Sequence, residues 1–251
     1  MSNYCDFAFY YDGLTNNIDY KKRAEYFDSL IKKYCFSGGK YLADLACGTG
    51  SLSEEFFSLG YDVIGIDNSE DMLSAALDKK YDSGSDIQYI CQDMSSFELY
   101  GNADIIICAL DSINHLSCPD DIKKTFQRAF MFTQPGGVFI FDANTVYKHK
   151  EILGNNSFIL ENDQVFCAWQ NSYSSENNRV DISLDFFEKN DEGKYDRYSE
   201  DFSEIALEKE EICSYLESTG FSVLACFDDD SSDPVHDKSQ RIIYVAGKNK
   251  T

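Results

Sequence analysis

Short apolar runs alternate with amphipathic segments between residue 40 and about residue 141. The runs predict strands at 41–45, 63–66, 87–91, 105–110 and 138–141, and the amphipathic segments predict helices at 51–59, 69–80 and 119–133. A further helix is expected before them, because apolar residues between 20 and 34 recur with the i, i+4, i+7 spacing of one buried face and Asp19 can cap the first turn. Such alternation is typical of a parallel sheet with helices on both faces.

The pattern changes after Asn144. Apolar residues at 165–169 and 180–186 alternate with polar ones, which predicts half-exposed antiparallel strands. A helix at 208–218 and two strands at 221–227 and 241–246 are then expected to return to the main sheet as an antiparallel edge. The predicted fold class is therefore α/β, a seven-stranded and mostly parallel sheet flanked by helices, with an antiparallel β insertion, or cap, after the fifth strand. The expected division is a main domain at 1–146 and 206–251 and a cap at 147–205.

Composition narrows the set of partners. The 22 basic and 44 acidic residues give a net charge of −22, which repels nucleic acid and anionic membranes. No apolar run approaches the roughly 18 to 20 residues that span a membrane. The nine cysteines are odd in number and lack C-x-x-C spacing, which favours a reducing compartment, so we expect a cytoplasmic protein. A monomer or a weak homodimer is expected.

The strand at 41–45 leads into a glycine-bearing turn, Ala46-Cys47-Gly48-Thr49-Gly50, and then a helix. Glycines at 48 and 50 allow a ligand to approach the backbone. Asp67 stands 19 residues after Gly48 (67 − 48), at the end of the next strand, where an acid accepts hydrogen bonds from both ribose hydroxyls. The spacing therefore predicts a nucleoside ligand, although a tight turn and a helix-initiating acid would also account for these residues.

Two details separate this site from a dinucleotide site. Ser53 replaces the third glycine, and Asp44 stands inside the strand before the turn. A carboxylate there suits a cationic amino acid better than a pyrophosphate. Met72, one helical turn after Ser69, could flank an adenine or belong to the core. Three residues after the third strand are candidates to hydrogen-bond and pack the adenine: Gln92, Asp93 and Met94.

The fourth strand ends at the point where open α/β sheets bind ligands. The candidate catalytic residues on the acceptor side follow it: Asp111, Asn114 and His115. A structural or solvated role for His115 is the alternative reading. Asp111 with Asp142 and Asn144 could hold a hard cation such as Mg²⁺, but capping and strand-end hydrogen bonds explain them as well, and no metal is expected.

These motifs, in this order, resemble those of the class I S-adenosylmethionine-dependent methyltransferases. The resemblance covers nearly the whole chain, and it is narrower with a bacterial small-molecule-type group that carries an N-terminal Tyr-Asp-x-Leu signature. The motifs that carry the resemblance are the signature at 11–14, the turn at 44–50, Asp67, Gln92-Asp93, Leu-Asp-Ser-Ile-Asn at 110–114 and Gln-Pro-Gly-Gly at 134–137.

The resemblance implies a Rossmann-like fold with S-adenosylmethionine as cofactor. It implies that Asp67 holds the ribose, that the turn at 46–50 lies along the methionine part, that Asp93 faces the adenine amino group and that Tyr11 helps to close the site. Asn68 and Leu110 are expected in the same cofactor site. Three positions depart from the family's pattern and weaken any transfer of acceptor specificity: Arg23, Phe202 and Ile205.

The expected function is methyl transfer from S-adenosylmethionine to a small-molecule acceptor by in-line displacement. Its leaving group is neutral, so positioning the acceptor about 3 to 3.5 Å from the methyl group dominates catalysis. Two alternatives remain open, a non-catalytic protein that binds the cofactor and, with less support, a nicotinamide-dependent oxidoreductase.

Overall fold

The computed structural model describes residues 18–161, 165–190, 192–229 and 231–250. Its main feature is a seven-stranded sheet in the order β10-β11-β5-β4-β1-β2-β3. The strands of this sheet are β1 (Tyr41–Leu45), β2 (Asp62–Asp67), β3 (Gln88–Cys91), β4 (Ala103–Cys108), β5 (Thr133–Asn144), β10 (Ser222–Asp228) and β11 (Arg241–Gly247).

The five strands from β1 to β5 are mutually parallel, so their carboxyl ends meet at one edge. Strand β11 lies between β5 and β10 and is antiparallel to both, so β10 forms the edge of the sheet. The observed ends of two strands differ from the predicted ends. Strand β4 stops at Cys108 because Leu110 and Asp111 have positive φ, and β5 continues to Asn144, paired with Arg241 of β11.

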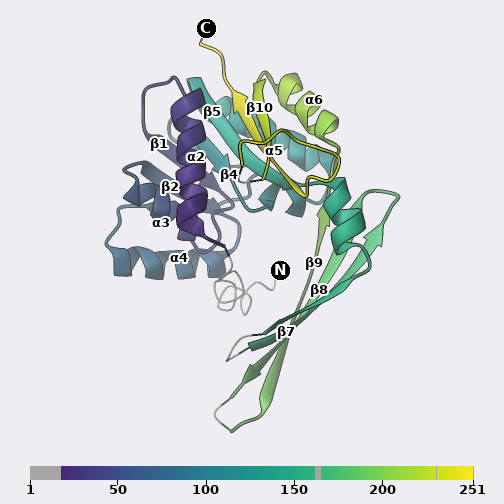
Figure 1. Ribbon diagram of the computed structural model, residues 1–251. Coiled ribbons are helices and arrows are strands. Elements are labelled where there is room, and N and C mark those ends of the chain that lie inside the picture. Colours follow the sequence, from purple (N-terminus) through teal and green to yellow (C-terminus); the bar gives the residue numbers. More distant parts are fainter. Residues whose placement is uncertain (1–17, 162–164, 191, 230, 251) are drawn as a thin grey trace.

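Helices cover both faces of the sheet (Figure 1). On one face, Phe27 of α2 (Tyr20–Tyr34) and Phe56 of α3 (Ser51–Ser58) are fully buried against the sheet, and α4 (Glu70–Ser83) packs beside α3. Helices α5 (Pro119–Phe132) and α6 (Lys209–Thr219) cover the other. Each buried phenylalanine stabilises the fold by roughly 1.5 to 3 kcal/mol. The predicted α/β class and its flanking helices are confirmed.

The chain leaves β1 toward β2 and β3 on one side of the sheet and then crosses to β4 on the other side. Loops after β1 and β4 therefore diverge and leave a crevice at the carboxyl edge, which is where ligands of open α/β sheets bind. All the sequence motifs at 44–50, 67, 92–94 and 110–114 follow strands at this edge.

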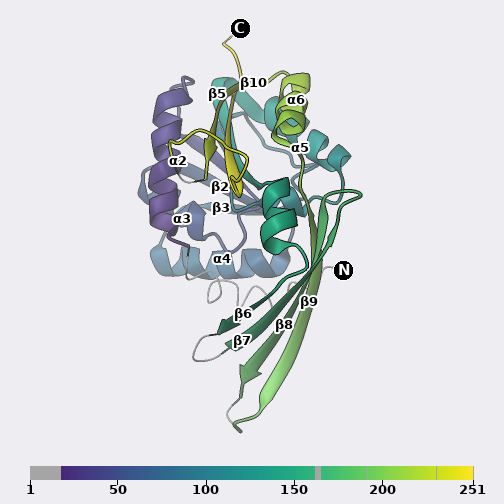
Figure 2. The same cartoon turned by 45° about the vertical axis from the view of Figure 1, so that its right-hand side comes forward.

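The insertion after β5 is an antiparallel sheet in the order β6-β7-β8-β9, preceded by a short π-helical turn, η2 (Lys148–Leu153). Its strands are β6 (Ser157–Glu161), β7 (Val165–Ser174), β8 (Arg179–Lys189) and β9 (Tyr195–Ile205). This sheet, called the cap below, extends away from the main sheet as a long twisted arm (Figure 2). The division of the chain into two domains at 147 and 205 stays a prediction.

Period-two alternation predicted β7 and β8 but missed β6 and β9. In β9 the inward positions include two acids, Glu200 and Glu204, which are buried although their residue type reads as exposed. Strand β6 is largely exposed and shows no alternation. Among the described residues, no helix is both long and apolar enough to cross a membrane.

Candidate functional site

The turn after β1 is built from residues with left-handed backbone conformations. Ala46, Gly48 and Gly50 have φ of 55°, 54° and 75°, and Cys47 N donates to Ile66 O at 3.0 Å, which anchors the turn to β2. A Cβ added at Gly48 would meet no atom within 4 Å, so this position opens onto free space. The turn therefore presents bare backbone to a ligand at Gly48.

Gly50 has a packing role in addition to the one its sequence position suggested. A Cβ at Gly50 would collide with the Tyr89 hydroxyl and lie 3.0 Å from Ala76 Cβ. Its own N–H donates to Cys47 O at 3.0 Å. The missing side chain is therefore required for packing between α3, α4 and β3, and the contact of Gly50 with the ligand stays a prediction.

Asp67 links the two halves of this turn region. Its Oδ2 accepts a hydrogen bond from Gly48 N at 2.8 Å and its Oδ1 accepts one from Ser69 N at 2.9 Å. Burial raises the pKa of Asp67, and these backbone hydrogen bonds offset part of the increase. The backbone N–H of Asn68 is a third donor to this carboxylate, which has about four acceptor positions, so Asp67 keeps capacity for a ligand hydroxyl.

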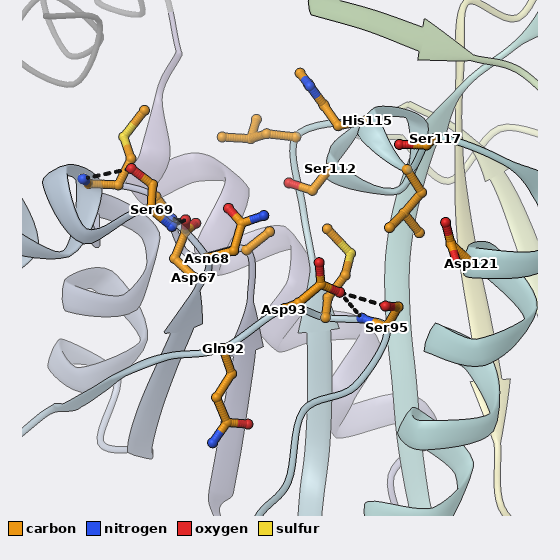
Figure 3. Close-up of a pocket in the computed structure, with 16 residues that line it drawn as sticks. Asp67, Asn68, Ser69, Gln92, Asp93, Ser95, Ser112, His115, Ser117 and Asp121 are labelled. Atoms are coloured by element: carbon orange, nitrogen blue, oxygen red, sulfur yellow. Dashed lines mark hydrogen bonds between the residues drawn. The ribbon is translucent and has the colours of Figure 1, made fainter. Parts of the chain in front are cut away.

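A cavity of about 300 Å³ lies at the carboxyl edge between the loops after β1, β2, β3 and β4 (Figure 3). It gathers most of the residues that the sequence singled out: Ala46, Gly48, Asp67, Asn68, Met72, Gln92, Asp93, Met94, Leu110 and His115. The sequence reasoning missed further lining residues: Ser69, Ser95, Ser112, Leu116, Ser117 and Asp121. Ser112 lies inside the 110–114 motif, which was the available signal for it.

The adenine-side candidates are held by local hydrogen bonds. Asp93 Oδ1 accepts from Ser95 N at 2.7 Å and from Ser95 Oγ at 2.6 Å. Gln92 Oε1 accepts from Glu98 N at 2.7 Å, and Figure 3 shows the Gln92 side chain directed away from the other labelled groups. Gln92 therefore organises the loop with its amide, while Asp93 keeps its second oxygen for a ligand.

A smaller cavity of about 40 Å³ adjoins the first and shares Ala46, Gly48 and Leu110 with it. Asp44 and Cys47 line this smaller space. Ser53 Oγ donates to Asp44 Oδ2 at 2.5 Å, which explains the serine in place of a third glycine. Burial raises the pKa of Asp44 to about 7, the hydrogen bond from Ser53 lowers it, and the charge of Asp67 adds to the increase.

Comparisons with known proteins agree with this geometry. A family model described as a methyltransferase domain matches residues 42–137. YqeM of Bacillus subtilis (strain 168), a protein named as a methyltransferase, is 30% identical over 249 residues, covering 99% of this chain and 98% of its own. The crystal structure of a S-adenosylmethionine-dependent methyltransferase from Clostridium acetobutylicum ATCC 824 is 33% identical, with a TM-score of 0.88 and coverage of 98% and 99%.

This chain belongs to the class I S-adenosylmethionine-dependent methyltransferases. Its cofactor is S-adenosylmethionine, as the resemblance implied, and the enzyme interpretation is preferred over the two alternatives left open by the sequence. The sugar N-methyltransferase KedS8 from Streptoalloteichus sp ATCC 53650 shares the fold at 18% identity, with a TM-score of 0.78 over 97% of this chain and 92% of its own. Tyr11 and the rest of the 11–14 signature lie outside the described residues.

The turn after β4, which is predicted to face the acceptor, is strained. Leu110 and Asp111 have φ of 58° and 54°, a conformation that costs free energy in residues other than glycine. Asp142 at the end of β5 compensates, because its two oxygens accept from Leu110 N at 2.7 Å and from Asp111 N at 2.9 Å. The turn after β4 is thus fixed from the neighbouring strand.

Asp111 and Asp142 are both ion-paired with Arg241, at 2.8 and 3.2 Å. Burial alone would raise the pKa of Asp111, but the charges of Arg241 and Lys148 outweigh it and hold the pKa well below its ordinary value. Asp111 lines neither cavity. Within the residues that the structure describes, no group of three His, Cys, Asp or Glu side chains could hold a metal ion.

Asn114 connects the turn after β4 to β5 and β9. Its Nδ2 donates to Ile205 O at 2.8 Å and Asn144 O at 3.1 Å, while its Oδ1 accepts from Asn144 N at 2.8 Å. The residue is 2% exposed. These contacts with backbone groups give Asn114 a structural role, and the acceptor-side role predicted for it stays a prediction.

His115 lies on the larger cavity with about a third of its side chain exposed, at 35%. Its ring stacks on Phe202 of β9 with a centroid separation of 5.2 Å, and its Nε2 lies 3.7 Å from Glu204 Oε1. The cap therefore reaches the site through β9. The sequence did not single out Glu204, because the strand that carries it was not predicted.

Glu204 is held in turn by groups behind it. Its Oε2 lies 3.1 Å from Asn144 Nδ2 and 3.1 Å from Nε2 of the fully buried His149. His149 Nδ1 faces Asn178 O at 3.3 Å, and a carbonyl only accepts, so the network assigns a hydrogen to Nδ1. His149 therefore meets Glu204 Oε2 through Nε2, which leaves Oε1 turned toward His115.

Proposed function

We propose that the enzyme transfers the methyl group of S-adenosylmethionine to a small-molecule acceptor by in-line displacement. The observation that carries this proposal is the position of Gly48, whose bare backbone opens onto both cavities between two carboxylates, Asp67 and Asp44. One carboxylate is placed for a pair of ribose hydroxyls and the other for an ammonium group. The donor and acceptor set of this chain thus fits the cofactor.

The adenosine part would occupy the larger cavity and the amino-acid part the smaller one. Asp67 would accept from the ribose hydroxyls, and Met72 and Met94 would pack against the base. Asp44, whose pKa is about 7, would accept from the ammonium group, which favours its ionised form. The cofactor supplies an electrophilic methyl carbon on a sulfonium, so the departing group is a neutral thioether.

Catalysis would then depend mainly on positioning. Asp44 and Asp67 would hold the cofactor so that its methyl group faces the acceptor, whose lone pair would replace the bond from that carbon to sulfur while sulfur keeps the electron pair. Orientation of this kind contributes roughly 7 to 11 kcal/mol to lowering the barrier. The proton that the acceptor loses would pass to His115, which contributes a further factor of about 10² to 10⁴ as a base.

Glu204 would orient His115 for this task. A carboxylate oxygen 3.7 Å from Nε2 attracts the hydrogen on that nitrogen, which leaves the lone pair on Nδ1 to receive a proton. Glu204 is a positioning residue in this scheme, because it acts through the histidine. Its own position is fixed by Asn144 and His149.

Several observations support a small acceptor. The larger cavity measures about 300 Å³ and would be shared with the cofactor, which leaves room for a compact molecule. The net charge of −22 disfavours nucleic acid.

The eight cysteines that the structure describes are free thiols, which supports a reducing, cytoplasmic setting.

The test is transfer of label. The purified enzyme is incubated with methyl-labelled S-adenosylmethionine and a bacterial metabolite extract, and products are separated by size and mass. We expect label in a small metabolite that gains the mass of one methyl group. Tight binding of S-adenosylhomocysteine with label in no acceptor, or in macromolecules alone, would contradict the proposal.

A further inference from the structure

The two cofactor cavities meet at a wall that carries a single hydroxyl group. Of the described residues, four line both the larger and the smaller cavity: Ala46, Gly48, Leu110 and Ser112. The first three can offer a ligand only backbone groups or hydrocarbon, because their side chains have no polar atom. Ser112 is therefore the residue of this set whose side chain can make a polar contact where the two cavities join.

The turn that carries Ser112 also orients its hydroxyl group. Ser112 is the first residue of η1 (Ser112–His115), a short helical turn that follows Asp111. Its Oγ donates to Ala109 O at 2.8 Å. A hydroxyl group has one hydrogen and two lone pairs, so an oxygen whose hydrogen is used in this way faces a ligand as an acceptor. Figure 3 shows the Ser112 side chain directed from η1 into the space between the labelled residues.

The backbone on both sides of Ser112 is fixed. Before it, Asp111 N donates to Asp142 Oδ2 at 2.9 Å, and the Asp111 side chain is ion-paired with Arg241 at 2.8 Å. After it, Asn114 N donates to Asp111 O at 2.7 Å. The Ser112 oxygen therefore keeps its position at the junction before a ligand arrives, and little ordering is needed on binding.

The junction is where the charge of the cofactor is expected. A sulfonium group joins the adenosine part of S-adenosylmethionine to its amino-acid part, so sulfur lies between the two cavities if each holds one part. This placement rests on the proposed function. There, Asp67 faces the ribose and Asp44 faces the ammonium group. A positive charge that loses water on binding needs a polar partner in the protein, and Ser112 Oγ is placed to be one.

We propose that Ser112 Oγ contacts the sulfonium group and makes the enzyme select the charged cofactor over its neutral product, S-adenosylhomocysteine. An oxygen lone pair attracts a positive sulfur and the polarised carbon atoms bonded to it, and it has no comparable attraction for a thioether. Ser112 thus makes its stronger contact before methyl transfer. It favours exchange of the product for fresh cofactor and does not lower the barrier to transfer, because it binds the ground state at least as well as the transition state.

The test compares three probes by calorimetric titration. They are S-adenosylmethionine, S-adenosylhomocysteine and sinefungin, an analogue that carries an amine on carbon in place of the methylated sulfur and so keeps a positive charge there. The quantity compared is the selectivity, the Kd of S-adenosylhomocysteine divided by that of each charged probe. It is measured in the wild type, Ser112→Ala, Ser112→Thr and Ser218→Ala.

Ser218 is the matched control. Its Oγ also donates to the carbonyl three residues earlier, Tyr215 O, at 2.8 Å, but on the exposed side of α6. Ser218→Ala therefore removes the same local hydrogen bond as Ser112→Ala and leaves the cavities untouched. Ser112→Thr restores a hydroxyl group at the junction and tests whether that group is what matters.

We expect Ser112→Ala to bind both charged probes about threefold to tenfold more weakly, the effect of losing one hydrogen-bond acceptor, and S-adenosylhomocysteine within about twofold of the wild type. Ser112→Thr and Ser218→Ala should keep the selectivity of the wild type. If Ser112→Ala fails to fold, Ser112→Cys replaces it, because a thiol sulfur accepts hydrogen bonds only weakly.

Unchanged selectivity in Ser112→Ala, or an equal loss of affinity for all three probes, would overturn the role of Ser112. Either result would leave the proposed function standing, because S-adenosylhomocysteine would still bind and transfer of label could still be observed. Absence of S-adenosylhomocysteine binding in the wild type would overturn the cofactor placement and this inference together. Label found only in macromolecules would contradict the small acceptor and not the contact at Ser112.

Discussion

Asp67 and Gly48 are joined by a hydrogen bond of 2.8 Å from the glycine N–H to the carboxylate. The bond couples the end of β2 to the turn after β1, so the carboxylate proposed to hold the ribose and the bare backbone of the turn keep a fixed spacing. A second bond, from Ser69 N at 2.9 Å, fixes the other oxygen. The two contacts orient the carboxylate before any ligand arrives.

Replacing Asp67 tests this arrangement. Asp67→Ala should weaken S-adenosylhomocysteine binding at least about tenfold, because the two ribose hydroxyls lose an acceptor worth about 1.5 to 3 kcal/mol. Asp62→Ala, at the exposed start of the same strand, is the control and should bind as the wild type does. Equal affinities of the two variants in calorimetric titrations would argue against the ribose role.

The two glycines of the turn should behave differently. Gly50→Ala places a methyl group against Tyr89 and Ala76 and should lower the free energy of unfolding by about 1 to 3 kcal/mol. The double variant Gly50→Ala with Tyr89→Phe removes the hydroxyl that the new Cβ meets, so part of the stability should return. Urea denaturation measures both, and a double variant no more stable than Gly50→Ala would count against the packing role.

Gly48→Ala should act on binding instead. Its new methyl group meets no protein atom but projects into the space assigned to the cofactor. We expect a stability loss of only about 1 to 2 kcal/mol from the left-handed conformation and a loss of S-adenosylhomocysteine affinity of about tenfold or more. Unchanged affinity in a titration would show that the ligand does not approach this residue.

Asp44 should make stability depend on pH. Its folded pKa of about 7 lies above the ordinary value of 3.8, so its contribution to stability is complete below pH 4 and is lost as pH rises through 7. Asp44→Asn carries no charge at this position. The difference between its free energy of unfolding and that of the wild type should therefore increase by about 2 to 4 kcal/mol, in favour of the variant, between pH 4 and pH 8. Chemical denaturation without cofactor measures this difference, and a gain independent of pH would show that Asp44 is ionised throughout.

Glu204 should affect turnover and not cofactor affinity. Glu204→Gln should lower kcat by about tenfold to a hundredfold and shift the acid limb of the kcat profile against pH, because His115 loses the charge that orients it. Asp201→Asn, on the exposed face of the same strand, is the control. A loss confined to KM, or an unaltered pH profile, would leave Glu204 with a purely structural role.

Spacing along the sequence was sufficient to predict the parts of the site that lie at strand ends. Asp44 and Asp67 are set by their positions in β1 and β2, and parallel strands bring such ends together, so the order of motifs predicted the cavity. Spacing did not reveal the packing contacts of Asn114 and Gly50, because their partners are the backbone of β5 and β9 and the side chain of Tyr89. No local pattern reports such distant contacts.

The part of the site that we assign to the acceptor was harder to predict from the sequence, for a related reason. Glu204 is buried in a strand whose inward face carries acids, and burial of an acid is decided by its partners, here His149 and Asn144.

We propose that the crevice between β1 and β4 binds S-adenosylmethionine through Asp44, Gly48 and Asp67. Calorimetric titration of the purified enzyme with S-adenosylhomocysteine, and separately with NADH, tests it most directly. We expect saturable heat with one molecule of S-adenosylhomocysteine per chain and none with NADH. Absence of heat with S-adenosylhomocysteine, or tighter binding of NADH, would contradict it.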